Sequence, residues 1–155
     1  MDKDVIISVK GTQTLFNNEK SELELITEGK YYKDGDAYLI TYDESEVTGM
    51  EGTTTILKVA DGVVTLMRCG SINSIFMFQR GQKHISYYDT EYGTFSVGVV
   101  TNDLNINVND NGGEIRVGYQ LEFNNNRSGY NDFHMLIREA GNTDDKYNRR
   151  YKTGN

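Results

Sequence analysis

Apolar and polar side chains alternate strictly in two neighbouring segments of the second half of the chain. The apolar positions are Leu104, Ile106 and Val108 in the first segment and Ile115, Val117, Tyr119, Leu121 and Phe123 in the second. Side chains on a β-strand point to opposite faces with a period of two, so each segment predicts a strand with one apolar face. The Asn111-Gly112 pair between them favours a type I′ turn, whose two central residues need positive φ. We therefore expect a hairpin here, with the second apolar row lining the protein interior.

The same alternation, interrupted by glycine, asparagine and aspartate, recurs along most of the chain. It predicts further strands at residues 4–14, 22–32, 37–43, 53–60, 63–69, 72–79, 83–90, 94–101 and 131–139. Most of the intervening turn signals, such as Asp61-Gly62, are of hairpin length and favour pairing between consecutive strands. We find no apolar stripe with helical spacing and a capping residue, so we expect little helix.

About ten short strands joined by hairpins are typical of an all-β sandwich or barrel. A meander of this kind exposes two edges unless it closes on itself. We therefore expect one all-β domain over residues 1–140, a single antiparallel up-and-down β-barrel of about 8–10 strands. The longest connection inside it is residues 44–52, and loops on a rigid scaffold often carry function.

Charge and cysteine content narrow the classes of partner and compartment. The net charge of −7 would repel phosphate groups, so we expect neither nucleic acid nor a membrane as partner. The first residues contain acids and no apolar run of signal-peptide length, so we expect a cytoplasmic protein. The single cysteine, Cys69, cannot form an internal disulfide, and its apolar neighbours predict a small buried side chain rather than a nucleophile.

Residues 141–155 differ from the rest of the chain, because they show no alternation and no aliphatic residue. They carry four basic and two acidic side chains, a net charge of +2, which leaves −9 for residues 1–140. We expect a disordered tail. The alternative is an arginine-rich arm that binds RNA or an acidic partner surface, for which six charges are weak support.

Motifs of the common enzyme classes are missing from this sequence. It contains no serine-hydrolase elbow, phosphate-binding loop, zinc-protease helix or dinucleotide-binding glycine pattern. The two histidines, His84 and His134, have no neighbours with metal-ligand spacing, and we expect them to be surface or hydrogen-bonded side chains. We therefore predict no metal, no cofactor and no enzymatic activity.

Arg68 is the polar residue with the most informative position. It shares a face of its strand with Val64 and Leu66, but the opposite face is also apolar, so the pattern leaves its orientation open. An arginine inside the barrel needs a counter-charge, and Glu44 beside Tyr42 is a candidate. Such an arginine would recognise a carboxylate or phosphate on a ligand, or would form a structural bridge at one barrel end. The candidate ligand-binding residues are Tyr42, Glu44, Arg68, Tyr88 and Tyr119.

Several short motifs together resemble one known family. In chain order they are Tyr42-Asp43-Glu44, Arg68-x-Gly70 with Ser74 and Phe78, Tyr88-Asp89-Thr90-Glu91-Tyr92-Gly93, Thr101, Asn111-Gly112-Gly113 and Tyr119-x-Leu121. Over about residues 4–139 this order resembles the bacterial YwiB-like proteins, a family of unknown function with a calycin-type β-barrel. Glu91 stands where the family usually has proline. The resemblance implies a closed or nearly closed barrel related in shape to lipocalins and fatty-acid-binding proteins, and it implies no activity.

Two functions remain open at this point. The first is a barrel that binds a small apolar or amphipathic ligand, with the candidate residues holding its polar end. The second is a filled barrel that acts as a protein-interaction module through residues 44–52 or an exposed strand edge, as a monomer or a dimer. A cavity near the lower limit of ligand pockets, about 300 Å³, distinguishes the first from the second.

Overall fold

Eleven antiparallel strands form the part of the chain that the computed structural model describes. The described residues are 2–14, 19–46, 48–71, 73–124, 126–127 and 129–140, without the side chains of Tyr88 and Thr90. The strands are β1 (Lys3–Thr14), β2 (Lys20–Asp34), β3 (Ala37–Asp43), β4 (Thr53–Ala60), β5 (Val63–Gly70), β6 (Asn73–Gln79), β7 (Lys83–Thr90), β8 (Gly93–Asn109), β9 (Gly112–Phe123), β10 (Asn126–Arg127) and β11 (Tyr130–Glu139). The tail predicted over 141–155 lies outside the described residues.

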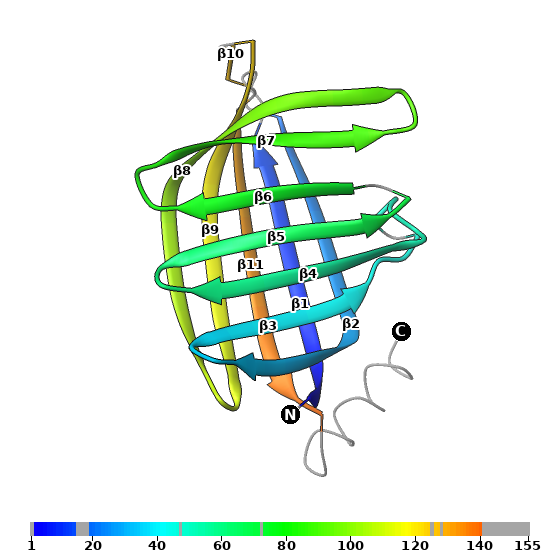
Figure 1. Ribbon diagram of the computed structural model, residues 1–155, viewed down its shortest axis with the longest axis vertical. Coiled ribbons are helices and arrows are strands. Elements are labelled where there is room, and N and C mark those ends of the chain that lie inside the picture. The colour runs from blue at the N-terminus through cyan, green and yellow to red at the C-terminus, as the bar shows by residue number, and fades with distance from the viewer. Residues whose placement is uncertain are drawn as a thin grey trace.

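The sheet closes into an up-and-down barrel (Figure 1). Strands β1 to β8 pair consecutively, β8 pairs with β9, and β11 closes the ring between β9 and β1. The two-residue strand β10 only extends the end of β9. The predicted all-β antiparallel up-and-down barrel is confirmed, with eleven strands instead of 8–10. In these ranges we find no helix with the length and apolar character that a membrane crossing requires.

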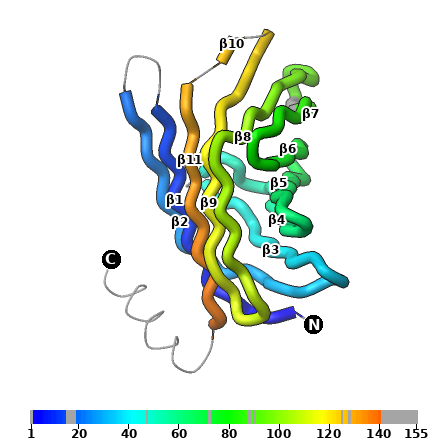
Figure 2. Tube along the Cα trace, turned by 90° about the vertical axis from the view of Figure 1, so that its left-hand side faces the viewer, coloured from blue at the N-terminus to red at the C-terminus, as the bar shows by residue number. Residues whose placement is uncertain are grey.

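The barrel is flattened into two walls. In Figure 1, β3 to β7 run across the front while β1, β2, β9 and β11 run steeply behind them, and Figure 2 shows the two walls from the side. Strand β8 belongs to both walls, because it pairs first with β7 and then with β9. A β-bulge between Thr101 and Asp103 lies along it, and bulges bend strands. The two segments predicted at 94–101 and 104–109 are therefore one bent strand.

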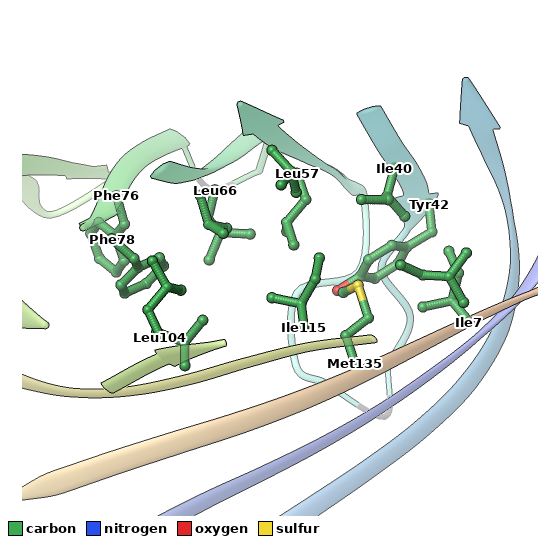
Figure 3. Close-up of a cluster of buried hydrophobic side chains, with 14 of the residues drawn as sticks. Ile7, Ile40, Tyr42, Leu57, Leu66, Phe76, Phe78, Leu104, Ile115 and Met135 are labelled. Carbon is green, nitrogen blue, oxygen red and sulfur yellow. The ribbon is translucent and has the colours of Figure 1, made fainter. Parts of the chain in front are cut away.

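Aliphatic and aromatic side chains form the core between the walls. Leu57, Leu66 and Phe78 from the front wall point toward Ile115 and Met135 from the back wall (Figure 3). All five side chains are buried.

The predicted lining row of β9 is confirmed except at its last position. Ile115 and Val117 are buried, and Tyr119 and Leu121 pack against the core. Phe123 is 45% exposed, so its predicted interior position is wrong. It lies beyond the last residue of β9 that pairs with β8 and faces only the short β10.

The β8–β9 hairpin forms where the sequence predicts it, but its turn differs in detail. The Asn109–Gly112 pair closes the hairpin, so Asp110 and Asn111 are its central residues. Positive φ occurs instead at Gly112 and Gly113 (124° and 146°). A Cβ atom at these glycines would lie 2.3 and 2.1 Å from backbone oxygens of adjacent strands, which only glycine allows. The predicted type I′ turn centred on Asn111-Gly112 is therefore wrong.

The two faces of β5 decide the positions of Cys69 and Arg68. Val64 and Leu66 are buried, so their face is the inner one. Cys69 lies on the outer face and is exposed, so its predicted burial is wrong. The alternation identifies which residues share a face, but both faces of this strand are apolar. Pairing with β4 and β6, which the sequence pattern does not contain, determines which face is inside.

Candidate functional site

Arg68 points into the barrel. It follows Val64 and Leu66 on the inner face of β5, and 19% of its side chain is exposed. Its partner across the β4–β5 ladder is Thr55, which is fully buried. The orientation that the sequence left open is therefore inward, and a charged group at this position needs a counter-charge.

Glu44 supplies that counter-charge. Its side chain is only 1% exposed, and its N–H group donates a hydrogen bond of 2.8 Å to the carbonyl oxygen of Thr53. The Thr55 hydroxyl donates a hydrogen bond to Oε2 of Glu44. The Nε atom of Arg68 lies 4.0 Å from the same oxygen, which is an ion pair without a direct hydrogen bond. The two charges face each other across the end of the barrel interior.

Four buried polar atoms have no hydrogen-bond partner within the described residues. They are Glu44 Oε1, Arg68 Nε, Ser74 Oγ and Asn131 Nδ2. Folded proteins leave few such atoms unsatisfied, since each costs about 1–3 kcal/mol. Ser74 pairs directly with Arg68 across the β5–β6 ladder. Unsatisfied polar groups are thus concentrated in one region of the interior.

A cavity of about 280 Å³ opens in this region. Its walls come from β1, β2, the end of β3 and the residues after it, and the inner faces of β4, β5, β9 and β11. Glu44, Arg68 and Asn131 lie in its lining, together with apolar side chains that include Val9, Leu25, Leu57, Leu66, Phe133 and Met135. The volume is close to the lower limit of about 300 Å³ that is usual for small-molecule sites. The barrel is therefore not completely filled by its own side chains.

Two tyrosines, the buried Tyr42 and the partly buried Tyr119, complete the polar end of the cavity. Burial and the nearby negative charge of Glu44 raise the pKa of Tyr42 well above its usual value, against the opposing effect of Arg68. Burial also raises the pKa of Tyr119, although the positive charge of Arg68 opposes this shift. The ring of Tyr119 packs against Phe78, with ring centroids 4.9 Å apart. Both hydroxyl groups are therefore neutral hydrogen-bond donors at physiological pH.

A second hollow, on the outer side of the front wall, also reaches Arg68 and Ser74. Backbone pairing between β6 and β7 is limited to the pairs Asn73–Asp89 and Ser74–Tyr88. These pairs lie at the end of β6 next to Arg68, and the ladder does not continue along the rest of the two strands. Arg68 contributes to the lining of both hollows.

The structure brings four of the five predicted site residues to one cavity. Tyr42, Glu44, Arg68 and Tyr119 all line it. The side chain of Tyr88 lies outside the described part of the chain, so its predicted role stays a prediction.

Sequence reasoning missed several polar residues of this site, among them Thr55 and Asn131. These two each carried a signal in the alternation. Thr55 is two residues before Leu57, and Asn131 is two residues before Phe133, so each shares an inner face with an apolar residue. A polar side chain in an apolar row is a candidate site residue, because burial without a partner is costly.

The histidines lie away from this cavity. His84 Nε2 is 3.2 Å from Gln79 Oε1, and His134 Nε2 is 2.5 Å from Glu114 Oε2. Both are therefore hydrogen-bonded, as the sequence predicted. No group of three histidine, cysteine or acidic side chains that could hold a metal occurs among the residues the structure describes.

Comparison with known proteins identifies relatives without a described activity. The uncharacterized β-barrel protein YwiB of Bacillus subtilis (strain 168) is 28% identical over 100 residues, which cover 64% of this chain and 68% of YwiB. The crystal structure of ywiB protein from Bacillus subtilis matches 90% of this chain and 94% of that chain with a TM-score of 0.80. The identity there is 19%, so this second similarity is one of fold. The predicted resemblance to YwiB-like proteins is confirmed. Since the domain of unknown function DUF1934 matches residues 7–135, this chain belongs to the DUF1934 family.

Proposed function

We propose that this barrel binds a small amphipathic molecule in the cavity between Glu44, Arg68 and Asn131. One observation carries the proposal: a largely apolar cavity of about 280 Å³ is lined by Glu44, Arg68 and Asn131, each of which has a buried polar atom without a partner within the described residues. An apolar tail would gain about 0.8 kcal/mol for each buried CH₂ group. A polar head group would satisfy the unpaired atoms at the other end.

The proposed role is binding without catalysis. Neither His84 nor His134 belongs to the lining of the cavity, and Cys69 lies on the outer face. The lining therefore offers no imidazole to activate a hydroxyl or thiol nucleophile. An exposed free thiol at Cys69 also suits a reducing compartment, which supports a cytoplasmic location.

Native mass spectrometry of the purified protein, combined with one pair of variants on β2, tests this proposal. Leu25 lines the cavity, and its neighbour Ile26 is 43% exposed on the outer face. Leu25→Trp should fill the cavity, and Ile26→Trp is the matched control on the same strand. We expect a retained small molecule, or uptake of an apolar dye, in the wild type and in Ile26→Trp but not in Leu25→Trp. Equal behaviour of all three proteins, with nothing retained and no dye uptake, would refute the proposal.

A protein-interaction role is the second candidate, and one observation favours it. The outer face of β6 and β7 exposes several large apolar side chains, among them Ile75 (55%), Ile85 (57%) and Tyr87 (65%). Clustered exposed apolar residues often mark interaction sites. The same spectra distinguish this role from ligand binding. A dimer or a bound polypeptide that Ile85→Lys removes, without a retained small molecule, would favour the interaction role.

A further inference from the structure

The two charges at the polar end of the cavity offset each other. Glu44 Oε2 and Arg68 Nε are 4.0 Å apart, and 1% and 19% of the two side chains are exposed. Charges at this distance in a poorly solvated site are strongly coupled, so the guanidinium charge is already matched. The cavity lining also contains Asp132, which is exposed at the rim and adds negative charge. The site therefore has no surplus positive charge for an anionic head group.

The unpaired atoms of the residues that line the cavity include both donors and an acceptor. Arg68 Nε and Asn131 Nδ2 can only donate, and Glu44 Oε1 can only accept while the carboxyl group is ionised. A carboxylate or phosphate ligand would satisfy the two donors but would place a second negative charge beside Glu44. An ammonium ligand would satisfy Glu44 but would face the charge of Arg68 and leave both donors unpaired. Either charged head group is therefore disfavoured.

Resting on the proposed binding role, we infer that the ligand carries an uncharged amide-type head group, such as a primary carboxamide or a lactam. Its carbonyl oxygen, with two lone pairs, accepts from Arg68 Nε and Asn131 Nδ2, and its N–H group donates to Oε1 of Glu44. Since these three atoms are almost inaccessible in the structure, binding includes a small rotation of their side chains. The apolar remainder lies along Val9, Leu57 and Phe133. An alcohol can also donate once and accept twice, but all three partners must then converge on one oxygen, whereas the donor and the acceptor of an amide lie on separate atoms.

Four probes with the same eight-carbon chain test this inference: octanamide, octanoate, octylamine and 1-octanol. Their affinities are measured by isothermal titration calorimetry and by displacement of an apolar dye from the cavity. We expect octanamide to bind at least tenfold more tightly than octanoate or octylamine, and more tightly than 1-octanol. The size of this preference follows from one unsatisfied hydrogen bond to a buried charged group.

Glu44→Gln tests the charge argument directly. This substitution removes the negative charge and leaves Arg68 unmatched, so octanoate should gain affinity and the preference for octanamide should reverse. Glu24→Gln is the matched control, since Glu24 is 70% exposed and lines a separate shallow hollow over β1, β2 and β11 rather than the cavity. If Glu44→Gln fails to fold, Asn131→Leu replaces it. That variant removes one hydrogen-bond donor without changing the charge. It should lower the affinity for octanamide at least fivefold more than the affinity for octylamine.

The outcomes separate failure of this inference from failure of the proposed function. Octanoate binding more tightly than octanamide to the wild type, or all four probes binding equally, would overturn the amide head group and leave the binding role standing. An unchanged preference in Glu44→Gln would also overturn it. If no probe binds and no dye is displaced, both the head group and the binding role are wrong.

Discussion

The buried Glu44–Arg68 pair should be strongly coupled in stability measurements. Arg68→Met removes the cation and leaves a carboxylate that is only 1% exposed, with Thr55 as its hydrogen-bond donor. Breaking a buried ion pair from one side costs about 3–5 kcal/mol of folding free energy. For a chain of this size, such a loss lowers the melting temperature by roughly 6–20 °C. We therefore expect Arg68→Met to be much less stable than the wild type.

The double variant Arg68→Met/Glu44→Gln removes both charges, so it should lose less stability than the two single variants combined. Coulomb's law gives about 4 kcal/mol for unit charges 4.0 Å apart at an effective dielectric constant of about 20. Partial exposure of Arg68 reduces this value, and we expect a coupling free energy of about 2–4 kcal/mol.

Urea unfolding followed by circular dichroism measures this coupling. The surface pair of Lys10 and Glu22 is the matched control, because its charged atoms are 3.7 Å apart while both side chains are about half exposed. The cycle of Lys10→Met and Glu22→Gln should give a coupling of about 0–1 kcal/mol. If the buried pair also couples by less than about 1 kcal/mol, Glu44 does not neutralise Arg68, and the charge balance assigned to the cavity is wrong.

Three further predictions follow from individual residues. Because the pKa values of Tyr42 and Tyr119 are raised, the folded state keeps protons that the unfolded state loses above about pH 10. These groups should therefore leave the free energy of unfolding unchanged below about pH 10 and lower it above about pH 10. A spectrophotometric titration should show more tyrosinate at about pH 11 in urea than in the native state. Cys69 is exposed, so a disulfide reagent should modify it in the native protein nearly as fast as in urea, and strong native-state protection would contradict its outward position. Gly113→Ala should lower the free energy of unfolding in urea by at least about 2 kcal/mol, because φ is 146° there and the added Cβ would lie 2.1 Å from a backbone oxygen. Its control, Gly11→Ala, has nothing within 4 Å of the added Cβ and should change the free energy of unfolding by less than about 1 kcal/mol. Equal effects of the two substitutions would contradict the strand packing around Gly113.

Much of the barrel could be predicted from local patterns, because its connections are short. Alternation and turn residues identify the strands, and hairpin-length turns leave consecutive pairing as the simplest arrangement. The errors fall where a position depends on distant strands. Phe123 continues the alternation of β9 but lies beyond the residues of β9 that pair with β8. Strand β8 bends at Thr101, where its pairing changes from β7 in one wall to β9 in the other. Neither feature is visible in the local sequence.

The site was predictable only in part, for a related reason. Tyr42, Glu44 and Arg68 could be selected as uncommon polar residues near apolar strand positions, but the inward orientation of Arg68 depends on which face of β5 the closed barrel covers. Asn131 reaches the cavity from β11, more than sixty residues from Arg68 in sequence. Only closure between β9, β11 and β1 brings these side chains to one cavity.

Amide chemical-shift mapping by NMR, with octanamide titrated into the protein, tests most directly whether this cavity is a binding site. The account predicts saturable shifts concentrated around Glu44, Arg68 and Asn131, which disappear in Leu25→Trp and persist in Ile26→Trp. No saturable shifts, or shifts confined to the outer face around Ile75 and Ile85, would contradict it.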